Sequence, residues 1–240
     1  MQCRVIFYGR NREIPLDLHR SLHGAIYKAL SCHPEYSLEL HTADPDAIKP
    51  FKGFTFGPLT GETEYVNGHR YLNGFAAVEI RSVDAELITL LTEAWTREPL
   101  VQLNRAPVEV AGLSVMDKHI STSSSCIRMV SPAVAYITQE NKRQVFFSPE
   151  EESFYKLIRV NAERKSKCFL ERDSVIDIEP LFTEKPRYER SLFKKTPITG
   201  WYGDFRLTGE PELLTLLYNT GLGAKNSEGF GMFDISGEKD

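Results

Sequence analysis

A glycine-rich stretch near the end of the chain carries the residue types and spacing that most clearly suggest chemistry. Two Gly-apolar-Gly units, formed by Gly221 with Gly223 and by Gly229 with Gly231, are separated by five residues that include Lys225. Glycine tolerates backbone conformations that other residues avoid, and it lets another backbone approach closely. A loop of this kind can turn its N–H groups toward an anion. The same glycines could instead serve only to pack the loop tightly between two domains.

Two nucleotide-binding motifs do not fit this spacing. A P-loop needs Lys followed by Ser or Thr directly after its last glycine, whereas Met232 follows Gly231 here. The dinucleotide fingerprint opens a helix, whereas this stretch follows the leucine-rich run 213–217. A helix C-terminal glycine would explain Gly221 alone. The stretch is therefore expected to bind a nucleotide in neither of these ways.

Three polar rings, His19, His23 and Tyr27, lie four residues apart in the segment 15–31, beside an apolar stripe with the same spacing. This periodicity predicts an amphipathic helix with the three rings on a face next to the buried one. Two histidines four apart on a helix can bind zinc, but the sequence shows no evident third ligand. Ordinary surface histidines are the alternative.

The elements that must position these residues follow the order of a ferredoxin-like fold in the first half of the chain. Apolar and turn patterns predict helices at 15–31 and 84–95 and strands at 4–8, 54–56, 76–80 and 108–115. The order β, α, β, β, α, β is shared with the RNA recognition motif. A run of serine and threonine at 121–125 is the expected linker. We therefore expect one domain at 1–120 and a second at 121–240.

The same order of elements recurs in the second half. Patterns predict a strand at 127–130, a hairpin of 134–137 with 144–147, strands at 175–182 and 198–207, a helix at 211–218 and a last strand at 229–235. Ser148, Pro149 and Glu151 have the spacing of a capping box with proline at the first helical position, so a helix is expected to begin there. The predicted fold class is α+β, with two ferredoxin-like domains in tandem and a C-terminal glycine-rich loop.

Composition describes an ordinary globular protein. Of the 240 residues, 41% are hydrophobic and 26% charged. No apolar run reaches the roughly 20 residues of a membrane helix, and the start has no signal-peptide core, so we expect a cytoplasmic location. The four cysteines are scattered, which favours free thiols. A net charge of −4 argues mildly against nucleic acid, although binding requires only a local basic patch.

The glycine-rich stretch resembles the C-terminal signature of the repeat-associated RNA-binding (RAMP) superfamily of CRISPR systems. In its branch of repeat-processing endoribonucleases, CRISPR-associated protein six, two Gly-apolar-Gly units flank five residues with a cation, as they do here. The resemblance implies a nuclease of antiviral defence that cuts CRISPR precursor RNA within repeats, without a metal or cofactor. By the same resemblance, attack by a 2′-hydroxyl leaves a 2′,3′-cyclic phosphate and a 5′-hydroxyl.

The resemblance also implies a catalytic tyrosine late in the first helix, a histidine in the following loop and a lysine just before the second strand. Tyr27, His41 and Lys52 match these three positions. Histidine suits proton transfer near neutral pH, and the lysine and tyrosine can hold phosphate oxygens or orient the nucleophile. Histidine placement varies in this family, so His23 and His19 are reserves and His33 a weaker one. A packed tyrosine, a loop histidine and an exposed lysine remain the plain alternatives.

Basic residues cluster at three places in the second half. Lys142 and Arg143 lie at the predicted hairpin tip, and Arg159, Arg164, Lys165 and Lys167 follow one helix. A loop carries the third cluster: Lys185, Arg187, Arg190, Lys194 and Lys195. Each cluster alone could be a solvated face. Together they predict a surface that tracks the phosphates of repeat RNA, which Lys225 and the glycine-rich loop would join.

Two other functions remain open. The chain could be a non-catalytic RNA-binding subunit of an RNA-guided effector complex that has kept the fold and the glycine-rich loop. It could also be a general single-strand RNA binder of the RNA recognition motif type, although the expected central strands lack that module's aromatic motif. Partners are expected to be repeat RNA and possible effector-complex subunits, with the chain a monomer or a homodimer.

Overall fold

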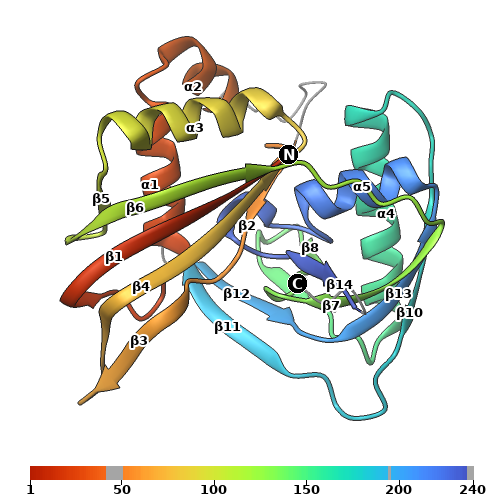
Figure 1. The fold of residues 1–240 in the computed structure, drawn as a ribbon. Helices are drawn as coiled ribbons and strands as arrows, with labels where there is room; N and C mark the ends of the chain where they lie inside the picture. Colours follow the sequence, from red (N-terminus) through yellow and green to blue (C-terminus); the bar gives the residue numbers. More distant parts are fainter. Residues whose placement is uncertain (42–50, 194–195, 237–240) are drawn as a thin grey trace.

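The computed structural model describes residues 1–41, 51–193 and 196–236, except for the side chains of three residues at the end of one helix, Leu38, Glu39 and His41. Two sheets lie side by side, each with two helices packed on one face (Figure 1). No helix in the described ranges is long and apolar enough to cross a membrane. The four cysteines, all within the described residues, form no disulfide.

The N-terminal sheet is antiparallel and ferredoxin-like in its central order. Within the described residues its path runs β2-β4-β1-β6-β5, with β3 paired to β4. Its strands are β1 (Gln2–Ile14), β2 (Phe54–Phe56), β3 (Thr60–Val66), β4 (His69–Ser82), β5 (Leu100–Leu103) and β6 (Ala106–Met116). Its helices are α1 (His19–Leu30), α2 (Pro34–His41) and α3 (Ala85–Arg97). Alternation along β1 explains the layer, because Cys3, Val5 and Phe7 are buried beneath α1 and α3.

The C-terminal sheet repeats the same strand order. In the described part of this half the order is β10-β13-β7-β14, and two separate hairpins, β8 with β9 and β11 with β12, project from it. The strands are β7 (Ser124–Met129), β8 (Tyr136–Thr138), β9 (Gln144–Phe146), β10 (Ile176–Pro180), β11 (Tyr188–Phe193), β12 (Thr196–Trp201), β13 (Asp204–Gly209) and β14 (Phe233–Ile235). The helices are α4 (Glu152–Phe169), α5 (Pro211–Thr220) and the short 3₁₀ turn η1 (Asn226–Glu228). The predicted tandem of two ferredoxin-like folds is confirmed, while the boundary at 120/121 stays a prediction.

Three local predictions are wrong. The segment 198–207 is two strands, because β12 leaves the sheet to pair with β11 and Tyr202-Gly203 turns the chain into β13. Helix α4 begins at Glu152 and not at Pro149. The Glu151 carboxylate accepts a hydrogen bond from Ser148 N at 2.7 Å and Ser148 Oγ accepts from Glu150 N, but the Glu151 backbone is extended (φ −113°, ψ 132°), so the helix starts after it. The stretch after α1, where the resemblance implies a loop, contains helix α2.

A buried guanidinium joins the two sheets. Arg81 on β4 is 1% exposed, and its Nη1 donates to Phe233 O of β14 at 2.5 Å. Its Nη2 donates to Asp234 at 2.6 Å, its Nε donates to Glu79, and its guanidinium stacks 3.8 Å above the Tyr218 ring. Charged hydrogen bonds of this kind are costly to break when buried. The two units are therefore fixed to one another along this line.

Candidate functional site

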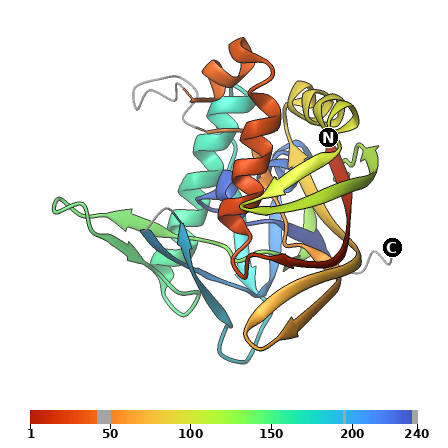
Figure 2. The same cartoon turned by 90° about the vertical axis from the view of Figure 1, so that its left-hand side faces the viewer.

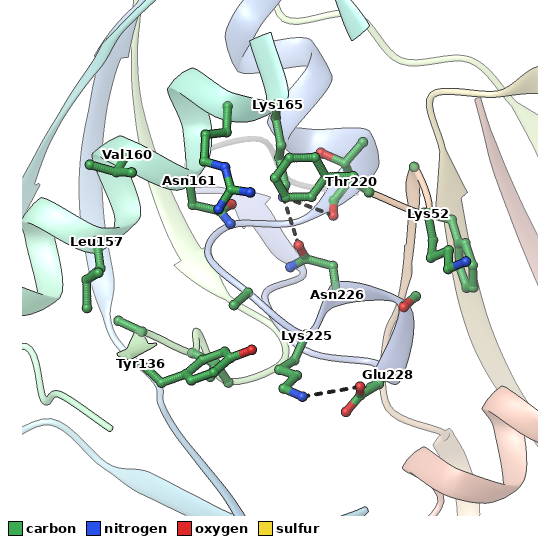
Figure 3. Close-up of a pocket in the computed structure, with 18 of the residues that line it drawn as sticks. Lys52, Tyr136, Leu157, Val160, Asn161, Lys165, Thr220, Lys225, Asn226 and Glu228 are labelled. Carbon is green, nitrogen blue, oxygen red and sulfur yellow. Dashed lines mark hydrogen bonds and ion pairs between the residues drawn. The ribbon is translucent and has the colours of Figure 1, made fainter. Parts of the chain in front are cut away.

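A cavity of about 530 Å³ lies where the two units meet (Figure 3). Lys52 lines it from the segment before β2, and Lys225 and Glu228 line it from the glycine-rich loop. Helix α4 supplies a further wall through Asn161 and Arg164. A residue predicted as catalytic and the predicted RNA-binding loop therefore border the same space, although they lie near opposite ends of the sequence.

Lys52 is held in place by the residue that follows it. Gly53 has φ of +71°, and its carbonyl oxygen accepts hydrogen bonds from Val83 N at 3.0 Å and from Ser82 Oγ at 3.1 Å. A Cβ on Gly53 would lie 3.2 Å from Val83 and 3.3 Å from the ring of Phe169, so the backbone passes closely between the two units. Burial lowers the pKa of the Lys52 ammonium.

Tyr27 approaches the same loop from helix α1. Its ring stacks on His23 with centroids 4.4 Å apart and tilts against Phe54 at 6.3 Å. Burial, followed by the charge of Glu228, raises the pKa of the Tyr27 hydroxyl to about 12. The phenol therefore keeps its proton at neutral pH and can donate a hydrogen bond. Glu228 therefore lies near Tyr27 and also lines the cavity that Lys52 borders.

His41 is the last residue of α2, so its backbone belongs to a helix and not to the expected loop. Its side chain lies outside the described residues. The relation of His41 to Tyr27 and Lys52 therefore stays a prediction from sequence spacing.

His19 is a structural link and not a surface histidine. Its Nδ1 lies 3.0 Å from Glu228 O, and its Nε2 lies 3.5 Å from Glu189 Oε1 on β11. The ring also stacks on Phe230 at 4.4 Å with only 3° between the planes. His19 thus positions the glycine-rich loop and the β11–β12 hairpin against α1. Among the residues that the structure describes, no three His, Cys, Asp or Glu side chains gather in a way that could hold a metal ion, so the zinc interpretation has no support there.

The other reserve histidines differ in their surroundings. His23 contacts Tyr27 and meets the Phe193 ring edge-on at 5.1 Å, so it lies beside the predicted catalytic tyrosine. His33 lies in a different hollow, which it lines with residues of α3 including Thr92 and Arg97.

The glycine-rich loop is buried between the units. All four of its Gly-apolar-Gly glycines have positive φ, from +72° to +92°. A Cβ on Gly231 would lie 2.1 Å from Leu222 O, and one on Gly229 would lie 2.5 Å from the Phe56 ring. These glycines are therefore required by close packing, one of the two expectations from sequence. Anion binding by the loop stays a prediction, and it depends on the half-buried Lys225, which pairs with Glu228 at 3.6 Å.

Lys165 does not belong to a basic surface, and its assignment to the α4 cluster is wrong. It is 1% exposed, and its Nζ donates to Gly221 O at 2.6 Å, to Asn226 Oδ1 at 2.8 Å and to Thr220 O at 3.4 Å. Burial lowers the pKa of this ammonium to about 7. The Asn226 amide in turn donates to Phe230 O at 3.0 Å. Lys165 therefore fastens the loop to α4, a role without a sequence signal because its partners lie 55 to 61 residues away.

The predicted RNA-binding cations of the β8–β9 hairpin and of the segment before and on β11 are exposed where the structure describes them, whereas Arg159 of α4 is half-buried and pairs with Asp177 at 2.9 Å. Lys142 and Arg143 lie at the tip of the β8–β9 hairpin, which projects from the body (Figure 2). Lys185, Arg187 and Arg190 are exposed before and on β11, and the Arg187 guanidinium stacks 3.7 Å above Tyr202. Lys194 and Lys195 lie outside the described residues. Contact of these cations with RNA stays a prediction.

Two functional candidates were missed by sequence reasoning. Glu228 lies three residues after Lys225, a spacing that favours an ion pair within one turn and could have drawn attention to it. Asn226 lies among the five residues between the glycines, of which sequence reasoning singled out only Lys225, and its amide donates to Leu222 O and Phe230 O at both ends of the loop.

Comparison with known proteins gives these observations a context. The sequence model described as "CRISPR associated protein Cas6, C-terminal" matches residues 115–235. A CRISPR-associated endoribonuclease Cas6 from Pyrococcus furiosus is 25% identical over 235 residues, which cover 95% of this chain and 85% of the relative.

Solved structures share the fold over the full chain. The structure of the product of a Cas6-related gene from Pyrococcus furiosus has a TM-score of 0.83 at 21% identity, covering 100% of this chain and 99% of the other. A RAMP protein described as binding different RNA substrates has a TM-score of 0.82 at 20% identity, covering 98% and 99%. At this identity the structures show a common fold. Because the sequence model matches more than half of the 240 residues, the chain belongs to the CRISPR-associated protein Cas6 family.

Proposed function

We propose that this chain is a metal-independent endoribonuclease that cleaves CRISPR precursor RNA within its repeats and so produces mature guide RNAs. The observation that supports this proposal is the cavity between the two units, which Lys52 lines together with Lys225 and Glu228 of the glycine-rich loop, while the Glu228 charge acts on Tyr27. The relative from Pyrococcus furiosus is named an endoribonuclease, which agrees with it.

The chemistry requires the protein to transfer protons, to stabilise negative charge and to orient the reacting group. A 2′-hydroxyl must lose its proton as its oxygen attacks the adjacent phosphorus, and the 5′-oxygen that leaves must gain one. We assign proton transfer to His41, since imidazole titrates near neutral pH. The Lys52 ammonium stabilises the negative charge that grows on the non-bridging phosphate oxygens. Tyr27, whose pKa of about 12 keeps it protonated, donates a hydrogen bond and orients the reacting group. The products are a 2′,3′-cyclic phosphate and a 5′-hydroxyl.

Cleavage of repeat RNA in excess chelator tests this function. We expect cutting to persist with chelator and to stop when the scissile nucleotide carries a 2′-deoxy sugar. His41→Ala should slow the cleavage step by about 10²- to 10⁴-fold with little loss of RNA binding, the usual contribution of one proton-transfer group. Lys52→Ala should also slow cleavage while the RNA still binds.

The outcomes separate this proposal from the alternative functions. Cutting of the deoxy substrate would contradict the cyclising mechanism. Tight and specific binding of repeat RNA without any cleavage would instead identify a non-catalytic RNA-binding subunit of an effector complex.

A further inference from the structure

The cavity between the units has aromatic rings paired with cations on two of its walls. Tyr136 of β8 lies under the Lys225 ammonium, with 5.4 Å between Nζ and the ring centroid. Phe51 lies under the Arg164 guanidinium of α4 at 5.8 Å. Proteins commonly bind unpaired nucleotides in hollows lined by aromatic rings and cations, because the bases stack on the rings and the phosphates contact the cations. The tyrosine and the α4 side chains come from elements outside the predicted catalytic set.

Asn161 on α4 supplies a polar group without a partner at the same cavity. Its Oδ1 is buried and has no hydrogen-bond partner within the described residues. Figure 3 shows Asn161 above Tyr136, with the Lys225–Glu228 pair to the right of the tyrosine. A buried acceptor without a donor is uncommon in native proteins and calls for an explanation. A ligand N–H in the cavity would satisfy it once the Asn161 amide turns toward the space that it lines.

The size and charge of the cavity agree with a nucleotide. A volume of about 530 Å³ falls within the range of sites that hold small organic ligands. Lys52, Arg164 and Lys225 lie along its lining, where Glu228 is the single acidic residue among those described. The balance of charge therefore favours a ligand that carries phosphate.

We propose that this cavity holds one unpaired nucleotide of the repeat RNA next to the bond that is cut. The base lies against Tyr136, an N–H on its edge donates to Asn161 Oδ1, and the flanking phosphates face Lys52 and Arg164. This inference rests on the proposed function for the identity of the RNA, and it adds a place where one base is read. Tyr136 and Asn161 are binding residues in this arrangement and take no part in bond breaking.

The test measures binding of a repeat RNA that carries a 2′-deoxy sugar at the scissile nucleotide, so that affinity is separated from cleavage. A set of such RNAs, each with one abasic nucleotide, is titrated against the wild-type protein. We expect one position beside the scissile bond to weaken binding by about 10-fold, because an abasic nucleotide can neither stack on the ring nor donate to the amide. Positions outside the cavity should show no coupling to Tyr136 or Asn161.

Variants then assign that position to the cavity. Asn161→Ala and Tyr136→Ala should each weaken binding of the intact RNA by about 5- to 10-fold, yet weaken the sensitive abasic RNA no further. Tyr136→Phe keeps the ring and should bind like the wild type. Ser153→Ala, exposed near the start of the same helix, and Tyr65→Ala, 67% exposed on β3, are matched controls that should leave binding unchanged.

Each result has one meaning. The nucleotide pocket would be overturned if each variant weakened binding of the abasic RNA by the same factor as binding of the intact RNA. It would also be overturned if no abasic position weakened binding. If wild-type protein still cleaves ordinary repeat RNA in those cases, the proposed function stands without the pocket. If wild-type protein neither binds nor cleaves repeat RNA, both proposals are wrong.

Discussion

The Nζ atom of Lys165 lies 2.6 Å from the carbonyl oxygen of Gly221, and this hydrogen bond joins helix α4 to the first glycine of the glycine-rich loop. Two further acceptors, Asn226 Oδ1 and Thr220 O, share the same ammonium. The loop is therefore held from within the protein and does not depend on RNA for its shape.

Loss of this ammonium should destabilise the fold. Lys165→Met keeps the length of the side chain but leaves three buried oxygens without their donor, so we expect the free energy of unfolding to fall by about 2 kcal/mol or more. Lys167→Met is the matched control, since Lys167 is 53% exposed and pairs with Glu163 and Asp173 at the surface. Its replacement should change the free energy of unfolding by less than about 1 kcal/mol. Urea unfolding of both variants measures the difference, and equal effects would contradict the role given to Lys165.

Glycine at position 231 should be indispensable to stability. Gly231→Ala places a Cβ 2.1 Å from Leu222 O at a φ of +79°, so backbone must shift, and we expect a loss of about 2 kcal/mol or more. Gly24→Ala in α1 meets nothing within 4 Å and should raise the free energy of unfolding by about 0.5 to 1 kcal/mol through helix propensity. Thermal or urea unfolding compares the two, and a harmless Gly231→Ala would show that the loop can repack.

Acid stability should depend on Glu189. The hydrogen bond from His19, aided by those from Tyr202 and Ser191, lowers the pKa of this carboxyl from 4.5 to about 2. Because the pKa of Glu189 is lower in the folded than in the unfolded state, the ionised carboxylate stabilises the fold fully above pH 4.5, and this stabilisation is lost as the pH falls toward 2. Glu189→Gln should therefore be less stable than wild type at pH 5, and the gap should narrow by about pH 3.

The control for this pH effect is another glutamate on an exposed strand. Glu179 is 57% exposed and pairs with Arg206 at 3.4 Å, so Glu179→Gln should show little gap at either pH. Urea unfolding of each variant and of the wild type at the two pH values gives the comparison. A gap for Glu189→Gln that stays constant between them would disprove the linkage.

RNA affinity should depend on the cations before β11. Replacing Lys185 and Arg187 with glutamate should weaken repeat RNA binding and lower the slope of log affinity against log salt by roughly 0.7 for each phosphate that the protein no longer neutralises. Arg105, exposed in the turn between β5 and β6, lies outside the three clusters, and Arg105→Glu should leave the slope unchanged. Titrations at several salt concentrations decide the point, and an unaltered slope in the double variant would exclude these residues from the binding surface.

The fold was predictable because its signals are local. Alternating residues in β1 and the four-residue spacing in α1 report burial on one face, and the order of the elements specifies the two-fold repeat. The misplaced start of α4 shows the limit of such signals. Ser148 and Glu151 form part of the expected contacts, but Ser148 Oγ caps a turn and not a helix.

The site was less predictable because burial and partners depend on residues far away in sequence. In the sequence Lys165 cannot be distinguished from the exposed cations of α4, and only the packing of Thr220 and Asn226 against it shows that it is buried. His19 likewise looks like a surface residue until the glycine-rich loop stacks Phe230 upon it. Lys52 and the loop could be named from sequence, while the cavity they share and the wall from α4 follow only from the packing of the two units.

Arg81 has a consequence for how a long ligand would meet this protein. The Arg81 guanidinium on β4 donates a hydrogen bond to a main-chain oxygen of β14, and this buried bond opposes rotation of one sheet against the other. The distance between the two sheets is therefore fixed. An RNA that contacts both sheets would have to adapt its own conformation to this fixed distance, because the two sheets do not move apart.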